Sequence, residues 1–161
     1  MLRIGLVYGL TRIRVPAEPP DVLACCGTEV GFGDRILFHW TRLLRWQARR
    51  AGVKANDACF GLAWSGHMTT ARILRLLPEV PEGETEIYFH PAARRDALLD
   101  RLMPDYEHEG ELAALLHLVA CGFGERHNLV QFVTANGSAK RQRRLHEELG
   151  YFVIARRARS R

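Results

Sequence analysis

The chain has 161 residues, of which 47% are hydrophobic and 25% charged, as is typical of one globular domain large enough to bury a core. Its net charge of +5 is concentrated in residues 122–161, where nine Lys or Arg outnumber three Glu, so residues 1–121 carry a net charge of −1. No apolar run approaches the roughly 20 residues that span a bilayer, and no signal-peptide cleavage pattern is present, so we predict a cytoplasmic protein.

The first part of the chain predicts short strands that alternate with helices. In order, we expect the end of a helix over residues 2–9, a strand at Arg12–Val15 ended by Pro16, an irregular segment PAEPPDV, a helix over residues 34–50 and a strand within VKANDACFGL. Asp34 is the predicted N-cap of the long helix, and Gly52 follows its end. Apolar residues recur at helical spacing along it (Ile36, Leu37, Trp40, Leu43, Leu44 and Trp46). Its arginines (Arg42, Arg45, Arg49 and Arg50) are expected to form a solvated face.

The alternation continues in the second part. We expect a helix over residues 70–77 capped by Thr69 and closed by Pro78, a strand over TEIYFH that Pro91 ends, and helices over residues 93–102 and 109–120. Short strands alternating with such helices are typical of an α/β fold with a parallel sheet. The basic tail predicts a strand at Leu129–Thr134, a helix over residues 139–149 and a strand at Tyr151–Ala155. We therefore expect two units, residues 1–121 and residues 122–161.

Three polar residues have positions that suit chemistry, because functional groups in parallel α/β folds lie after the carboxyl ends of strands. His90 ends the strand TEIYFH and can donate or accept a proton near neutral pH. The alternative for His90 is a structural hydrogen bond to a neighbouring carbonyl. Asp57 can hold a histidine or a sugar hydroxyl, or form a turn. His67 lies in a Ser-Gly-His-Met loop, which suits ligand contact and turn formation equally.

The sequence contains no motif for a metal or a phosphate group. Neither HExxH, HxxxH, a glycine-rich phosphate loop nor GxSxG is present. The four cysteines have no CxxC spacing, so we predict free thiols at Cys25, Cys26, Cys59 and Cys121. We therefore predict no metal ligands and no cofactor in this chain.

Three segments carry a resemblance to a known family. RVPAEPP, AGVKANDACFGLAWSGHMT and TEIYFHPAARRDALLDRLMPDYEHEGELAALL resemble consecutive blocks of the hopanoid-biosynthesis-associated branch of the YdjC-like carbohydrate deacetylases, over about residues 1–116. The combination of GLxxSGHMT with EIYFHPA makes the resemblance specific. It implies part of a (β/α) barrel, with short parallel strands and flanking helices, that belongs to the C-terminal half of the family domain.

The resemblance also implies an activity. Family members remove acetyl groups from N-acetylated amino sugars with one divalent metal, Mg or Zn, and in this branch the implied substrate is a hopanoid-linked N-acetylglucosamine. His90 matches the His-Pro motif and is implied to be the catalytic proton donor. Asp57 and His67 match positions near the same face, and we assign them to substrate binding. We expect the three side chains to share a cleft.

The resemblance does not extend to the whole family domain. Its metal ligands come from segments that would precede residue 1, so we expect a truncated chain that is inactive alone and would act on an amino sugar or glycolipid if an N-terminal half completed it. An open half-barrel exposes strand edges and apolar helix faces, so we expect it to form a homo-oligomer, pair with the missing half or be poorly soluble.

The tail supports an alternative of another class. Lys140, Arg141, Arg143 and Arg144 lie on one short predicted helix, which suits non-specific contact with nucleic acid or another anionic surface. We favour a solvated helix face, because no aromatic residues are interleaved with these charges. The tail could therefore make the chain a non-catalytic binding protein, although we expect no nucleic-acid partner.

Overall fold

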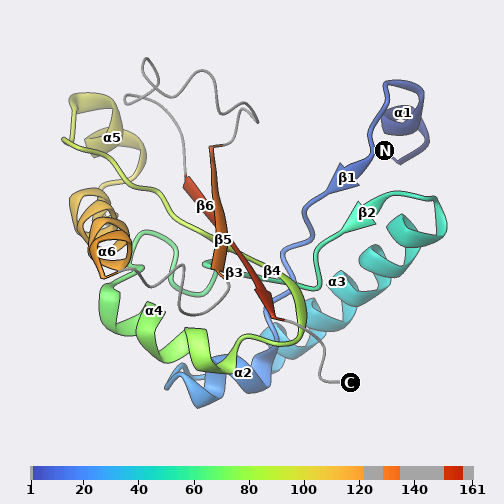
Figure 1. Cartoon of the computed structure of the whole chain (residues 1–161), viewed down its shortest axis with the longest axis horizontal. Coiled ribbons are helices and arrows are strands. Elements are labelled where there is room, and N and C mark those ends of the chain that lie inside the picture. The colour runs from blue at the N-terminus through green and yellow to red at the C-terminus, as the bar shows by residue number, and fades with distance from the viewer. Residues whose placement is uncertain (1, 122–128, 135–150, 158–161) are drawn as a thin grey trace.

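The computed structural model describes residues 2–121, 129–134 and 151–157 and has a mixed α/β architecture. The helices are α1 (Leu2–Val7), α2 (Pro20–Cys25), α3 (Phe32–Arg50), α4 (Thr70–Leu76), the 3-10 helix η1 (Leu77–Glu79), α5 (Ala97–Leu102) and α6 (His108–Ala120). The strands are β1 (Arg12–Ile13), β2 (Lys54–Ala55), β3 (Ala58–Phe60), β4 (Gly83–Tyr88), β5 (Leu129–Thr134) and β6 (Tyr151–Arg157). Figure 1 shows α4 and α6 on one side of the strands and α3 on the other.

The predicted short parallel strands are present. β1 pairs with β2 in parallel, and β3 pairs with β4 in parallel. The two pairs are continuous, because the backbone N–H of Cys59 donates to the carbonyl of Ala17 at 2.9 Å, beyond the end of β1. Three segments of chain, residues 12–17, 54–60 and 83–88, therefore run side by side in one direction. Whether they belong to a barrel remains a prediction.

Asn56 explains why the predicted strand within VKANDACFGL is divided into β2 and β3. Its buried carboxamide accepts from the backbone N–H of Val15 at 2.7 Å and donates to the carbonyls of Val15 and Ala58, both at 2.8 Å. The side chain thus provides the hydrogen bonds that an unbroken ladder would have supplied from its backbone, which keeps these buried groups paired.

The other edge of β4 is occupied by antiparallel strands. β6 pairs with β4 and with β5, which gives the order β3-β4-β6-β5. β5 has the predicted bounds, and β6 starts at the predicted Tyr151. The predicted basic helix over residues 139–149 lies outside the described residues. The division into units at residue 121 remains a prediction.

The core lies between β3, β4 and the helices α4 and α6. Phe60 and Ile87 from the strands pack in one cluster with Ile73 and Leu76 of α4 and Leu115 of α6, and each of these is at most 4% exposed. Burial of a large apolar side chain contributes about 1.5–3 kcal/mol. This cluster therefore fixes the positions of the strand ends, where the polar residues lie.

The structure corrects three local predictions. Pro20 to Val22 belong to α2 and not to an irregular segment, because proline is well tolerated in the first turn of a helix. α3 begins at Phe32, so Asp34 is not its N-cap but accepts from the backbone N–H of Gly31 at 2.8 Å from inside the first turn. The helix predicted over residues 93–102 begins only at Ala97, after Asp96 caps it.

The cap that Thr69 was expected to supply to α4 is confirmed, because its hydroxyl oxygen lies 3.4 Å from the backbone N of Arg72 and accepts from it.

The long helix α3 bears the predicted solvated arginine face in part, since Arg42 and Arg50 are exposed and Arg45 is half-buried. Its buried residues are Thr41 and Ala48. Arg45 donates to the carbonyl of Asp57, and Arg49 donates to the carbonyl of Ala55 and the carboxylate of Asp57. The basic side of the helix therefore contacts the β2–β3 connection, while its large apolar residues face outward.

The four cysteines are free thiols, as predicted. No helix in the described part of the chain is both long enough and apolar enough to cross a membrane.

Candidate functional site

The carboxyl ends of the three parallel segments bring several polar groups to one edge. The first segment ends at Glu18, β3 is followed by the turn Gly61–Ala63, and β4 is followed by Phe89 and His90. Ligands of parallel α/β folds bind outside this edge of the sheet. The edge is therefore the candidate site, and its chemistry follows from the contacts of the residues that line it.

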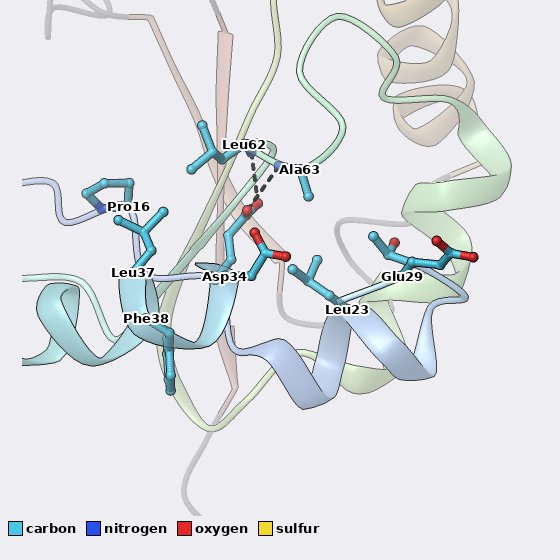
Figure 2. Close-up of a pocket in the computed structure, with 10 residues that line it drawn as sticks. Pro16, Leu23, Glu29, Asp34, Leu37, Phe38, Leu62 and Ala63 are labelled. Carbon is cyan, nitrogen blue, oxygen red and sulfur yellow. Dashed lines mark hydrogen bonds between the residues drawn. The ribbon is translucent and has the colours of Figure 1, made fainter. Parts of the chain in front are cut away.

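Glu18 holds the turn after β3. Its carboxyl group accepts three backbone hydrogen bonds, from Gly61 and Leu62 at 2.8 Å and from Ala63 at 3.0 Å (Figure 2 draws those to Leu62 and Ala63). Gly61 has φ +120°, and an added Cβ would overlap the carbonyl of Tyr88, so only glycine fits there. Burial raises the pKa of Glu18, and the three N–H donors oppose that rise.

A pocket of about 310 Å³ opens beside Glu18. Figure 2 shows the acidic side chains of Glu29 and Asp34 on its walls, together with apolar side chains from α2, α3 and the turn after β3. The apolar lining residues are Pro16, Leu23, Leu37, Phe38, Leu62 and Ala63. Such a mixture of apolar wall and a few acceptors suits a small ligand that carries hydroxyl groups.

His90 lies immediately past β4, and its ring is enclosed by aromatic neighbours. It makes edge-on contacts with Tyr88, at 5.6 Å between ring centroids, and with Tyr106, at 5.1 Å. Burial lowers the pKa of His90, the neighbouring His108 lowers it further, and Glu111 opposes the change. The buried Nδ1 atom of His90 has no hydrogen-bond partner among the described residues. The ring is therefore held neutral, with one nitrogen uncommitted.

Two buried residues of α6 fix the backbone around His90. Glu111, 1% exposed, accepts from the backbone N–H of His90 with one carboxyl oxygen and from the backbone N–H of Met68 with the other, at 3.0 Å. His108, 2% exposed, places its Nδ1 atom 2.5 Å from the carbonyl of His90. Glu111 thus joins the backbone of the His90 segment to that of the Ser-Gly-His-Met loop.

The Ser-Gly-His-Met loop packs against Tyr106. The hydroxyl groups of Ser65 and Tyr106 are 2.9 Å apart, and Gly66 has φ +79° with the Tyr106 ring against its Cα. The backbone N–H of Glu107 donates to the carbonyl of Gly66 at 2.7 Å. Because Tyr106 also contacts the ring of His90, its side chain lies between the loop and His90.

His67 lies on this loop with its side chain turned to another opening. Its Nδ1 is 3.7 Å from the carboxylate of Glu107, and it lines a shallow cavity of about 490 Å³ between α4 and α6. The structure therefore brings the backbone of His67 close to His90, through Met68 and Glu111, while the imidazole of His67 faces the second cavity.

Asp57 lies at the opposite end of the strands. It precedes β3, its backbone N–H donates to the carbonyl of Glu84 at 2.7 Å, and its carboxylate accepts from the backbone N–H of Glu84 at 2.9 Å. Glu84 is at the start of β4, whereas His90 follows its end. The structure thus separates Asp57 from the cleft that we expected it to share. Asp57 lies between β2 and β3, so it is at the amino end of the β3–β4 ladder, whereas His90 is at the carboxyl end. Its substrate-binding role remains a prediction.

Sequence reasoning missed four residues of this edge. They are Glu18, Tyr106, His108 and Glu111. Glu18 had a detectable signal, since it is a charged residue between prolines directly after a predicted strand. The other three belong to a segment that follows the strands by 18 residues or more, and no local pattern indicates which site they approach.

The family resemblance implies one divalent metal ion in the complete family domain. The described residues contain no group of three or more His, Cys, Asp or Glu side chains that could hold a metal ion. The residues of this edge do not fit such an ion, and we assign none of them to one.

Residues 1–120 match the family model described as YdjC-like protein. No curated protein and no solved structure matches the chain.

Proposed function

Because residues 1–120 match that model, the chain belongs to the YdjC-like family, and we propose that it acts in the removal of acetyl groups from N-acetylated amino sugars. The link between this family and carbohydrate deacetylation supports the proposal. The resemblance of GLAWSGHMT and EIYFHPA to the hopanoid-associated branch supports the narrower substrate, a hopanoid-linked N-acetylglucosamine.

One observation carries the proposal, namely that His90 follows the carboxyl end of β4 and that its buried Nδ1 atom has no hydrogen-bond partner among the described residues. In deacetylation the oxygen of water bonds to the acyl carbon, the C–N bond breaks, and the leaving amine nitrogen takes a proton. His90 would accept the proton from water and deliver it to that nitrogen. A lowered pKa keeps His90 neutral, and therefore able to accept a proton, at pH 7. It also makes the protonated ring a stronger acid toward the amine.

The pocket beside Glu18 would hold the sugar. Asp34 and Glu29 can accept hydrogen bonds from sugar hydroxyls, while Leu37 and Phe38 pack against the apolar face of the ring. Glu18 would act indirectly, because its carboxyl group already holds the turn that forms one wall. His67 remains a proposed substrate contact through the second cavity.

We further propose that turnover requires metal ligands other than the described residues, as the family resemblance implies. The isolated chain would then bind the amino sugar and position its proton-transfer group without hydrolysing the amide. The homo-oligomer expected from the sequence would not supply these metal ligands, because a second copy carries the same residues.

Saturation-transfer NMR of the full chain with N-acetylglucosamine tests the binding step. Transfer to the acetyl methyl group should be clear for the wild type, several-fold weaker for His90→Gln, and unchanged for Glu109→Gln, which alters an exposed carboxylate on the neighbouring helix α6. Absence of transfer in the wild type, or equal transfer in His90→Gln, would contradict the proposal.

A second assay tests whether hydrolysis needs metal ligands other than the described residues. Purified chain incubated with N-acetylglucosamine and either Mg²⁺ or Zn²⁺ should release no acetate above the blank. Acetate release that disappears in His90→Gln would confirm the role of His90 and refute the need for further metal ligands. Release that persists in His90→Gln would refute both.

The binding function of the tail remains a separate hypothesis. Its basic helix lies outside the described residues, and no described contact favours it. Retention on heparin that is lost on changing Lys140, Arg141, Arg143 and Arg144 to Ala would support it.

A further inference from the structure

α3 exposes large apolar side chains along most of its length. Phe32 and Trp40 are 80% and 66% exposed. The others that are at least two-fifths exposed are Ile36, Leu37, Leu43, Leu44 and Trp46. Positions 32, 36 and 40 follow one another at intervals of four, and positions 43 and 44 lie three and four residues after 40, so they share one side of the helix. A contiguous apolar surface of this kind marks an interaction site in soluble proteins.

The charges on α3 itself are mostly positive, and the guanidinium of Arg35 lies 3.9 Å from the exposed carboxylate of Asp21 on α2. Arg35, Arg42 and Arg50 are exposed on the helix, and the guanidinium of Arg50 lies 5.0 Å from the centre of the Trp46 ring. The single acid of the helix, Asp34, is engaged by the backbone N–H of Gly31. The helix therefore combines an apolar side that is rich in tryptophan with a basic flank, which is the composition of helices that lie in a lipid–water interface.

Charge decides between a bilayer and a second copy of the chain. In a two-fold symmetric dimer the same patch contacts itself, so Arg42 and Arg50 would face the arginines of the other copy, while Asp21 of each copy lies beside its own Arg35. An anionic lipid surface instead complements these arginines, and each arginine near such a surface contributes about 1 kcal/mol to binding.

We infer that α3 lies on the surface of an anionic lipid bilayer, with Trp40 and Leu43 in contact with the acyl chains and Arg35, Arg42 and Arg50 at the headgroups. The helix rests on the membrane and does not cross it. Its first turns continue into the pocket, since Leu37 and Phe38 also line the wall beside Glu18 (Figure 2). If the proposed function holds, a glycolipid could thus present its sugar to the pocket while its apolar part stays in the bilayer.

Tryptophan fluorescence of the full chain with lipid vesicles tests the inference. Of the three tryptophans, Trp64 is 5% exposed, so a blue shift on binding reports Trp40 and Trp46. Vesicles of equal parts phosphatidylglycerol and phosphatidylcholine should bind the chain and shift its emission. Pure phosphatidylcholine, or 0.5 M salt, should weaken binding at least several-fold.

Matched variants locate the contact. The pair Trp40→Ser and Leu43→Ser should weaken vesicle binding more than tenfold, because each change removes an apolar side chain worth about 1.5 kcal/mol or more when buried. Leu98→Ser and Leu102→Ser alter equally exposed leucines on α5 and should leave binding unchanged. Thermal unfolding checks that the variants fold, since none of these side chains is buried.

Several results would overturn the inference. These are no blue shift with anionic vesicles, equal losses in the α3 and α5 variants, or binding abolished by alanine at Lys140, Arg141, Arg143 and Arg144 but retained by the α3 variants. Sedimentation showing a dimer that Leu43→Ser dissociates, without vesicle binding, would assign the surface to a second copy. N-acetylglucosamine binding is measured without lipid, and vesicle binding is measured without sugar. Failure of either proposal would therefore leave the result of the other assay interpretable.

Discussion

The carboxyl edge around His90 and the outer side of α3 follow opposite rules of burial. At the edge, polar groups are buried and held, since Glu111 is 1% exposed and hydrogen-bonds two backbone N–H groups, one from each functional motif. On α3, apolar side chains are exposed, and two arginines of the helix bond to the β2–β3 connection. Buried paired polar groups specify one geometry, whereas an exposed apolar side needs an external partner.

The difference teaches that the two regions serve different tasks. The edge is organised by contacts within the chain, so its geometry exists before any ligand arrives. The α3 surface gains nothing from the chain's own fold, so its stabilisation depends on what it binds. Changes at the edge should therefore alter stability, and changes on α3 should alter association.

The sharpest test of this contrast is Glu111→Ala. Removing the carboxyl group leaves the buried N–H groups of Met68 and His90 unpaired, and each unsatisfied donor costs about 1–3 kcal/mol. We expect the free energy of unfolding in urea to fall by about 3–5 kcal/mol. Glu109→Ala, an exposed neighbour on α6, should change it by less than about 0.5 kcal/mol. Similar small losses for both would show that the edge is not organised by Glu111.

Two leucines compare the core with α3 directly. Leu76 is fully buried in the core cluster, whereas Leu43 is 44% exposed. Leu76→Ala should lower the free energy of unfolding by about 3 kcal/mol through lost transfer energy and a cavity. Leu43→Ala should lower it by less than about 0.5 kcal/mol in the absence of lipid. A large loss from Leu43→Ala would mean that α3 is covered in solution, and it would break the comparison.

Gly66→Ala probes the packing of the Ser-Gly-His-Met loop on Tyr106. An added Cβ meets both an unfavourable φ of +79° and the Tyr106 ring. The matched variant is Gly52→Ala after α3, where φ is +77° but nothing lies within 4 Å. Both should lose the roughly 1 kcal/mol of a left-handed residue, and Gly66→Ala should lose about 1 kcal/mol more. Equal losses in urea titrations would show that the contact with Tyr106 contributes little.

Most of the fold was accessible from the sequence, because its elements carry local signals. Thr69 caps α4 as predicted, and β5 has its predicted bounds. The errors occurred where tertiary contacts override local pattern. Asn56 divides a strand by bonding to Val15, a residue 41 positions earlier. Periodicity likewise found α3 but could not show which side is buried, because small residues, Thr41 and Ala48, are the ones that pack inward.

The candidate site was less accessible. His90 could be identified because a histidine at the end of a strand and before a proline is a local sequence pattern. The residues that surround His90 could not be predicted in this way. Glu111 and His108 contact it across 21 and 18 residues of sequence, and nothing in their own segment indicates that approach. Asp57 was predicted to lie near His90, and this prediction was wrong. The break between β2 and β3 places Asp57 at the start of the β3–β4 ladder, at the opposite end from His90.

The smallest effect tests the electrostatics of the edge. Burial lowers the pKa of His90 below 6.5, so as pH falls the unfolded chain binds a proton before the native chain does. Stability should therefore be lost as pH falls from about 6.5 toward the lowered native value, by less than 1.4 kcal/mol per pH unit. His90→Gln should reduce the loss of unfolding free energy between pH 7.5 and 5.5 by up to about 1 kcal/mol. An unchanged pH dependence, or an imidazole NMR titration of His90 centred above 6.5, would show that the edge does not hold this ring neutral, and the proton transfer proposed for it would lose its physical basis.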